Sequence, residues 1–279
     1  MTSLASSIAL CALMVGTVGC TRHDRPPSDP HGPQTAAKGL PVVVVLSASR
    51  TQTLADGSTR PTGFFLNEFY EVKRGLDAAG VPYVLATVGG AVPALDPESV
   101  NEKYWTDHPQ WRDEAVTWFE EAAEVRTPLA LTDVARDPSA FSGVVVPGGQ
   151  GVMGDLLHDA DLHSLLIELG GAGRPVGLVC HAPAVLSQLP AGRSPFEGRR
   201  VTSVSAFEEV YIERVVMGAK ATNRRIGRQL RRSGLKHRAA FPGRGHAVRD
   251  GNLVTSQNPF SGEAFVELYV AALAEGAGR

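Results

Sequence analysis

The sequence has few cysteines, no long apolar run and almost no net charge. Its three cysteines, Cys11, Cys20 and Cys180, are too few and too scattered for a disulfide framework or a cysteine-rich zinc site. No apolar run reaches the roughly 18 residues that a membrane-spanning helix needs. The net charge of -2, from 27 basic and 29 acidic residues, gives no overall attraction to nucleic acid. The 279 residues, 43% hydrophobic and 20% charged, instead indicate a globular protein with one large α/β domain or two small ones.

The N-terminus contains an uncharged apolar stretch at residues 8–18, which is too short to span a membrane but suits the core of a secretory signal. A small residue, Cys20 and a polar, proline-rich stretch follow. This order resembles a bacterial lipoprotein leader and predicts a signal over 1–20, a lipid on Cys20, a flexible tether over 21–39 and an extracytoplasmic, membrane-anchored protein. No Lys or Arg precedes the apolar core, and Thr17 stands where such signals usually carry leucine. The alternative is a cytoplasmic protein with a non-functional leader.

The rest of the chain alternates between strand and helix patterns. The run PVVVVL at 41–46 is continuous and β-branched, as in a strand that is covered on both faces of a parallel sheet. This alternation predicts a doubly wound, mostly parallel sheet with helices on both faces, which binds ligands beyond the carboxyl ends of its strands. The other expected strands are 81–88, 144–146 and 176–179, with weaker candidates at 201–205 and 252–255, and the expected helices are 65–79, 162–169, 182–189 and 263–274.

One acidic segment interrupts the alternation. Residues 96–124 hold nine acidic side chains and all three tryptophans of the chain, Trp105, Trp111 and Trp118. We expect a small helical cap, inserted at about 96–136 into a domain that spans 40–279, with its tryptophans packed down on one edge of the sheet. The alternative is a tryptophan-lined wall of a substrate site.

The stretch RPVGLVCHAP at 174–183 places a thiol between a strand and a helix. A buried strand ends at Val179, and Pro183 occupies the first turn of the next helix, where proline is tolerated. Cys180 at this turn is directed into the cleft, as in the nucleophile elbow of hydrolases. We expect the helix N–H groups to lower the pKa of Cys180 and favour the thiolate. The alternative is a small, buried and inert cysteine.

Two further segments face the same edge of the predicted sheet. The turn GGQG at 148–151 lets the backbone approach a ligand closely, and its amides can stabilise an oxyanion on a substrate that Cys180 attacks. Glu68, in TGFFLNE at 62–68, stands among apolar residues at the start of a predicted helix. Burial there would raise the pKa of Glu68, so that it could carry a proton near neutral pH. The alternative for Glu68 is a solvated residue of a first helical turn.

Together these stretches resemble the ThiJ/PfpI superfamily, also called the Parkinsonism-associated deglycase family, and within it the branch of heat-shock chaperones with glyoxalase III activity. The matching stretches extend from about residue 41 to 275 and comprise TGFFLNE (62–68), VVPGGQG (145–151), GDL (154–156), CHAP (180–183), VTSVSAFEE (201–209) and DGNLVTSQNP (250–259). The resemblance implies a flavodoxin-like fold of the class I glutamine amidotransferase type.

The resemblance also implies roles for individual residues. Cys180 would be the nucleophile, His181 its base and Glu68 the acid that hydrogen-bonds the thiol. Glu209 would orient the histidine, although Glu208 directly precedes it. The backbone amides of Gly149 and His181 would form the oxyanion site, with Gln150 beside them.

This sequence departs from the family at three positions that line the expected cleft. Gln150 stands where the family usually has histidine, and Ala182 and Ser256 stand where it usually has glycine. These departures affect the expected substrate more than the thiol. Residues 69–80 contain none of the histidines through which some members bind a metal. We therefore predict no metal site and no cofactor, and the resemblance implies a homodimer whose contact surface the sequence does not locate.

The implied chemistry is the cofactor-independent conversion of a reactive 2-oxoaldehyde such as methylglyoxal to a hydroxy acid, a lyase reaction of the glyoxalase III type. The Cys180 thiolate would add to the aldehyde, and Glu68 or His181 would move a carbon-bound proton through an enediol to a thioester that is hydrolysed. The alternatives are a stress chaperone and a sensor in which Cys180 oxidises to a sulfinate. A peptidase or amidase has no separate support.

A basic run near the C-terminus suggests a different kind of contact. Residues 214–249 contain eleven Lys and Arg and no acidic residue before Asp250, and Arg224, Arg228, Arg231 and Arg232 are spaced to share one side of a helix. There is little aromatic interleaving, so we expect no binding of nucleic acid. We expect a solvated surface, or one attracted to anionic lipid or to the acidic cap.

Overall fold

The valine-rich run after Pro41 forms β1 (Val42–Val45), which lies inside a seven-stranded sheet. The computed structural model describes residues 39–276. The strand order is β10-β11-β7-β6-β1-β4-β5, and all neighbours are parallel except β10 and β11. The other strands of this sheet are β4 (Tyr83–Thr87), β5 (Leu129–Ala130), β6 (Gly143–Val146), β7 (Val176–Val179), β10 (Ala247–Asp250) and β11 (Leu253–Ser256).

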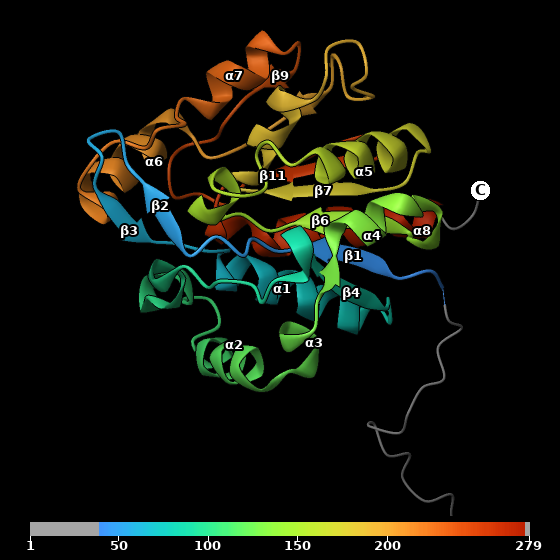
Figure 1. Ribbon diagram of the computed structural model, residues 1–279, viewed down its shortest axis with the longest axis horizontal. Helices are drawn as coiled ribbons and strands as arrows, with labels where there is room; N and C mark the ends of the chain where they lie inside the picture. Colours follow the sequence, from blue (N-terminus) through green and yellow to red (C-terminus); the bar gives the residue numbers. More distant parts are fainter. Residues whose placement is uncertain (1–38, 277–279) are drawn as a thin grey trace, which may run out of the picture. The chain divides into compact units, whose positions relative to one another are not determined.

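Helices cover both faces of the sheet (Figure 1). The helix α1 (Leu66–Ala78) packs with α8 (Gly262–Gly276), and α4 (Leu131–Arg136) packs with α5 (Ala160–Gly171). Every residue of β1, β6 and β7 is buried, as a sheet that is covered on both sides requires. The predicted doubly wound, flavodoxin-like α/β fold is confirmed.

The sheet differs from the sequence prediction at one edge. The antiparallel edge strand β10 was not predicted, because its residues are only partly buried and mix charged with apolar side chains. The weaker candidate at 201–205 shortens to β8 (Arg200–Val201), which pairs with β9 (Lys236–His237) in a separate two-stranded sheet. Next to this edge, the predicted helix at 182–189 is a 3-10 helix, Ala182–Gln188.

The acidic segment over 96–136 contains helices and also an edge strand. Its helices α2 (Gln110–Glu121) and α3 (Ala123–Arg126) precede β5, which extends the main sheet beside β4. The tryptophans pack against α1: the ring of Trp118 lies 5.1 Å from that of Phe69, and Arg74 lies over Trp111. None of the three tryptophans lines the cavity described below, so the packing interpretation holds.

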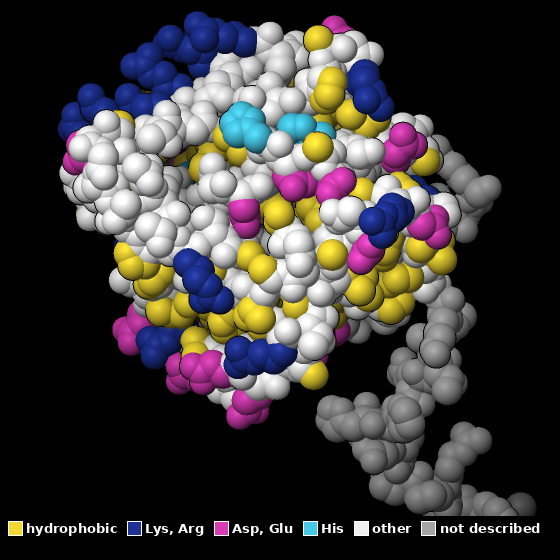
Figure 2. All heavy atoms as spheres, in the orientation of Figure 1, with side chains coloured by type: hydrophobic (Ala, Val, Ile, Leu, Met, Phe, Trp, Pro, Cys, Tyr) yellow, Lys and Arg dark blue, Asp and Glu magenta, His cyan; other side chains and the backbone are white. Residues whose placement is uncertain are grey.

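The basic segment divides between several elements. The helix α6 (Ala206–Tyr211) continues as a π-helix (Ile212–Met217), and α7 (Ile226–Arg232) follows. Arg224 precedes α7 and pairs with Glu213 at 2.5 Å, so the predicted four-arginine helix face is wrong at this position. Lys and Arg side chains gather over α7 in Figure 2, and the acidic α2 lies at the opposite end of the view in Figure 1.

The expected leader, lipidation site Cys20 and tether to residue 38 lie outside the described residues and stay predictions. Within residues 39–276, no helix combines the length and apolar character that a membrane crossing needs.

Candidate active site

Cys180 occupies a sharp turn directly after β7. Its φ of 56° lies in the left-handed region, which is unusual for a residue with a side chain and matches a nucleophile elbow. The turn is held by two backbone hydrogen bonds, from Cys180 N to Ser256 O (2.9 Å) and from Val204 N to Cys180 O (3.0 Å). Only 5% of Cys180 is exposed, yet it lines a cavity. The backbone therefore presents the sulfur at the carboxyl end of the sheet, as predicted.

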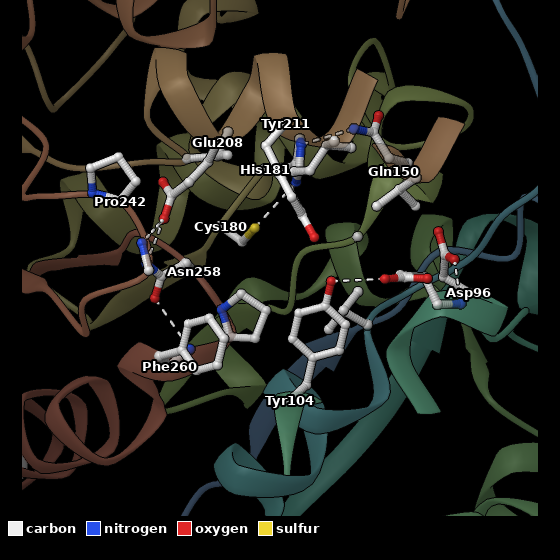
Figure 3. A pocket seen from close by; sticks show the side chains of 18 of the residues that line it. Asp96, Tyr104, Gln150, Cys180, His181, Glu208, Tyr211, Pro242, Asn258 and Phe260 are labelled. Atoms are coloured by element: carbon white, nitrogen blue, oxygen red, sulfur yellow. Dashed lines mark hydrogen bonds between the residues drawn. The ribbon is translucent and has the colours of Figure 1, made fainter. Parts of the chain in front are cut away.

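His181 lies next to the sulfur and is neutral. Its Nδ1 is 3.2 Å from Cys180 Sγ, and its Nε2 is 2.9 Å from Nε2 of Gln150 (Figure 3). Burial lowers the pKa of His181 to about 4. The imidazole is thus uncharged at neutral pH and has one N–H to donate.

A chain of polar side chains determines which nitrogen carries that proton. The hairpin of β2 (Thr51–Thr53) and β3 (Thr59–Pro61) carries Gln52 and Arg60 on opposite strands. The guanidinium of Arg60, which can only donate, bonds Oε1 of Gln52 (3.5 Å), and Gln52 Nε2 donates to Oε1 of Gln150 (2.9 Å). Gln150 therefore turns its Nε2 toward His181. Its donation makes His181 Nε2 an acceptor, so Nδ1–H of His181 points to the sulfur.

Glu68 lies in the first turn of α1, where it interacts with Cys180, and only 2% of it is exposed. Its Oε2 accepts a hydrogen bond from Gly148 N (2.8 Å), and its Oε1 has no hydrogen-bond partner. Burial raises the pKa of Glu68 to about 8, against a smaller lowering by its interactions with Cys180 and Gly148. The carboxyl is mostly protonated at neutral pH, and its interaction with Cys180 places it where it can exchange a proton with the thiol.

Gly148 lies so close to both Cys180 and Glu68 that no side chain fits at its position. A Cβ at this position would lie 2.7 Å from both Cys180 Cβ and Glu68 Oε2. Gly149, with φ of 100°, also lines the cavity, and its N–H has no backbone acceptor within residues 39–276. This amide is available to an oxyanion, whereas the His181 amide interacts with the Cys180 sulfur.

The expectation of a resting thiolate is wrong. Burial raises the pKa of Cys180 well above its usual value, and the negative charges of Glu68 and Glu208 add to this. The amide of His181 lowers the pKa, in the expected direction, but its effect is smaller than that of burial. The thiol therefore stays protonated until a substrate enters and its proton is transferred.

The sulfur opens into a cavity of about 390 Å³. In Figure 3, Tyr104 and Tyr211 approach from opposite sides with their hydroxyl ends facing each other, and Cys180 lies to one side of them. Most of the lining side chains are apolar or aromatic, and the polar ones gather near the sulfur and around Asp96. The arrangement offers one nucleophile, one free amide and a large apolar space.

Comparisons with known proteins agree with this architecture. The sequence profile of the DJ-1/PfpI family matches residues 76–272, more than half of the chain. The chain belongs to the DJ-1/PfpI family. The resemblance to ThiJ/PfpI proteins that the motifs indicated is thereby confirmed.

Several members of the DJ-1/PfpI family resemble this chain. The protein/nucleic acid deglycase HchA of Escherichia coli O157:H7 is 25% identical over 198 residues, which cover 69% of this chain and 66% of that protein, just under two thirds of its length. The crystal structure of glyoxalase III from Candida albicans superposes with a TM-score of 0.69 at 23% identity, covering 84% of this chain and 97% of that one. Rapid Encystment Protein 24 kDa of Francisella tularensis gives 0.67 at 21% identity, covering 83% and 98%. At these identities the two structures show a shared fold.

The residue expected to orient His181 does not contact it in this DJ-1/PfpI protein. Glu209 instead accepts a hydrogen bond from the backbone N–H of Ile226 (3.2 Å), where α7 begins. Glu208 lines the cavity and its negative charge favours protonation of His181, but its carboxylate is hydrogen-bonded to four other groups and not to His181. Gln150 bonds Nε2 of His181 in the place where a carboxylate was expected. The donors to Glu208 are Ser205 N, Gln257 Nε2, Gly243 N and Asn258 Nδ2.

Some groups of the site were not predicted from the sequence. Gln52 and Arg60 act through Gln150 from a short hairpin whose residues carry no motif. Tyr104 and Tyr211 come from the acidic segment and from α6, which only tertiary contacts bring together. Asn258 belongs to the family motif DGNLVTSQNP, so the polar residues that follow β11 were the one available signal. Within residues 39–276, no three His, Cys, Asp or Glu side chains are arranged to hold a metal ion.

Proposed function

We propose that this protein is a cofactor-independent, cysteine-dependent enzyme that converts a 2-oxoaldehyde to a 2-hydroxy acid, as from methylglyoxal to lactate. The observation that carries the proposal is the thiol of Cys180 at a strained turn, between the N–H of His181 and the buried carboxyl of Glu68. The names of the relatives, a deglycase and a glyoxalase III, support a reaction on reactive carbonyl compounds.

The first step is addition of sulfur to the aldehyde carbon. The ionised fraction of Glu68 takes the thiol proton while Sγ attacks, and Nδ1–H of His181 stabilises the developing sulfur anion. The free amide of Gly149 stabilises the oxygen anion that forms. Glu68 returns its proton to that oxygen and leaves a hemithioacetal. In this arrangement His181 acts as a donor, because its Nε2 already accepts from Gln150.

The second step moves a proton from one carbon to the next. Glu68 interacts with Cys180, so its carboxylate can remove the hydrogen of the carbon that is now bonded to Sγ, which gives an enediolate. Return of this proton to the neighbouring carbon, with transfer of the hydroxyl proton from the first oxygen to the second, gives a thioester of the 2-hydroxy acid. Water hydrolyses the thioester, releases the acid and restores the thiol, so the net reaction adds one water and needs no oxidant or reductant. General acid–base help of this kind contributes about 10²–10⁴ in rate.

The test is methylglyoxal consumption by the full chain and by two variants. Cys180→Ser removes the nucleophile and should lower turnover by about 10³-fold or more. Cys20→Ser removes a cysteine outside the expected site and should retain the rate. Lactate, identified by chromatography, is the expected product. Full turnover by Cys180→Ser would overturn the mechanism, whereas no turnover by the unaltered chain would favour a non-enzymatic role.

A further inference from the structure

The cavity is larger than the substrate that defines the proposed reaction. Its volume is about 390 Å³, within the range of about 300–1,000 Å³ that sites for drug-sized ligands occupy. Methylglyoxal carries only a methyl group on its reactive dicarbonyl unit. With that unit at Cys180, most of the cavity would hold nothing but water. The space beyond the sulfur therefore suits a larger substituent.

The walls around this space are aromatic and aliphatic. Tyr104 packs edge-on against Phe65, with ring centroids 4.9 Å apart, and lies 6.0 Å from the ring of Phe260. Tyr211 approaches from the opposite side in Figure 3 and belongs to α6, which also supplies Phe207 to the lining. The side chain of Phe207 is 77% exposed although it borders the cavity, so it would lose contact with water when an apolar group enters.

The charged side chains of the cavity already have partners. Arg60 pairs with Asp96 at 3.2 Å, and Lys103 pairs with Glu98 at 2.5 Å. The third carboxylate, Glu208, is held by four donors. The cavity lining thus contains two cations and three carboxylates. A phosphate or carboxylate group on the substrate would find no unpaired cation there to bind.

We infer that the substrate is a 2-oxoaldehyde whose second carbonyl carries an aromatic or extended apolar group, rather than a methyl, phosphate or carboxylate group. The inference rests on the proposed function, and it assigns Phe207 and Tyr211 as residues that determine specificity. The dicarbonyl unit lies at Cys180 and the free amide of Gly149, and the apolar group lies between Tyr104 and Tyr211.

The experiment compares phenylglyoxal with methylglyoxal on the full chain, from initial rates. Both compounds present the same reactive end, and their products are mandelate and lactate. We expect kcat/KM for phenylglyoxal to exceed that for methylglyoxal by about tenfold or more, a factor that partial burial of an aromatic ring supplies. Phe207→Ala should lower the ratio of the two kcat/KM values severalfold. The ratio within each protein cancels any general loss of folding.

Phe241→Ala is the matched control, because Phe241 is 76% exposed and does not line the cavity. This variant should leave the ratio unchanged. An equal or higher kcat/KM for methylglyoxal would overturn the inference and leave the proposed function standing, as would an unchanged ratio in Phe207→Ala. If neither compound is consumed faster than by Cys180→Ser, the proposed function itself fails.

Discussion

The protonation states of three buried residues, Cys180, Glu68 and His181, determine how the site reacts. At neutral pH the thiol is protonated, Glu68 is mostly protonated and His181 is neutral, because burial opposes every charged form. Together the three side chains carry no net charge in the absence of substrate. Reactivity then depends on which group can accept the thiol proton, and that depends on the hydrogen bonds of the histidine.

Gln150 can be changed to test this dependence. In Gln150→Glu the side chain keeps its size, but the amide that donates to His181 Nε2 becomes a carboxylate that accepts from it. The carboxylate favours imidazolium, and a positive ring 3.2 Å from Sγ favours thiolate. We expect the pH midpoint of Cys180 alkylation by iodoacetamide to fall by about one pH unit or more.

The readout is mass spectrometry of the peptide that contains Cys180, so other thiols do not contribute. Gln188→Glu serves as the control, because Gln188 ends the 3-10 helix after the cysteine turn and does not line the cavity. It adds the same charge without contacting His181. An identical alkylation profile in Gln150→Glu and the unaltered protein would contradict the assigned direction of the hydrogen bonds.

Two packed helices position the acid of the site. The helix α1 carries Glu68 in its first turn, and it lies directly against α8 along the glycine at position 75. A Cβ on Gly75 would overlap the side chain of Val266, and both methyl groups of that valine would have to move. The close approach of α1 to α8 thus depends on the absence of a side chain at residue 75.

Gly75→Ala should therefore lower the free energy of unfolding by about 1–3 kcal/mol, as overpacking does. Urea denaturation followed by circular dichroism measures the loss. The double variant Gly75→Ala/Val266→Ala should recover part of it, because the shorter side chain makes room. Gly171→Ala, in α5 with open space around it, should be neutral or slightly stabilising. A loss in Gly75→Ala that the second change leaves intact would contradict the packing argument.

At the scale of the whole molecule, the sequence was informative where local rules decide the structure. Periodicity located the sheet strands around β1, because a valine run that is buried on both faces has few alternative conformations. The strand-to-helix turn placed Cys180 at the edge of the sheet for a similar reason. The family motifs predicted that Glu68, Cys180 and His181 share one site, and in the structure Cys180 contacts both of the other side chains.

The incorrect predictions concern quantities that depend on distant parts of the chain. The pKa of Cys180 follows from burial by the whole fold and not from the turn alone. The partner of His181 is Gln150 and not Glu209, because Glu209 is engaged where α7 begins. Arg224 leaves the expected helix face to pair with Glu213. Each outcome required knowledge of which side chains meet in three dimensions.

Global stability should depend on pH through Glu68. Its folded pKa of about 8 lies above the ordinary glutamate value of 4.5, so the folded state holds a proton that the unfolded state releases. Stability from this group is fully present below about pH 4.5 and is lost as pH rises toward 8. Glu68→Gln removes the titration while keeping the shape.

The free energy of unfolding of Glu68→Gln relative to the unaltered protein should therefore increase between pH 5 and 9, by on the order of a few kcal/mol. Chemical denaturation at several pH values measures this difference. Glu114→Gln, at a half-exposed carboxylate paired with Arg74, is the control and should change the free energy of unfolding by no more than about 1 kcal/mol, as loss of an exposed ion pair does. A flat difference for Glu68→Gln would mean that Glu68 is ionised in the folded protein. The thiol proton would then have an acceptor already in place before substrate binds, and the resting site would carry a negative charge that the cavity must accommodate.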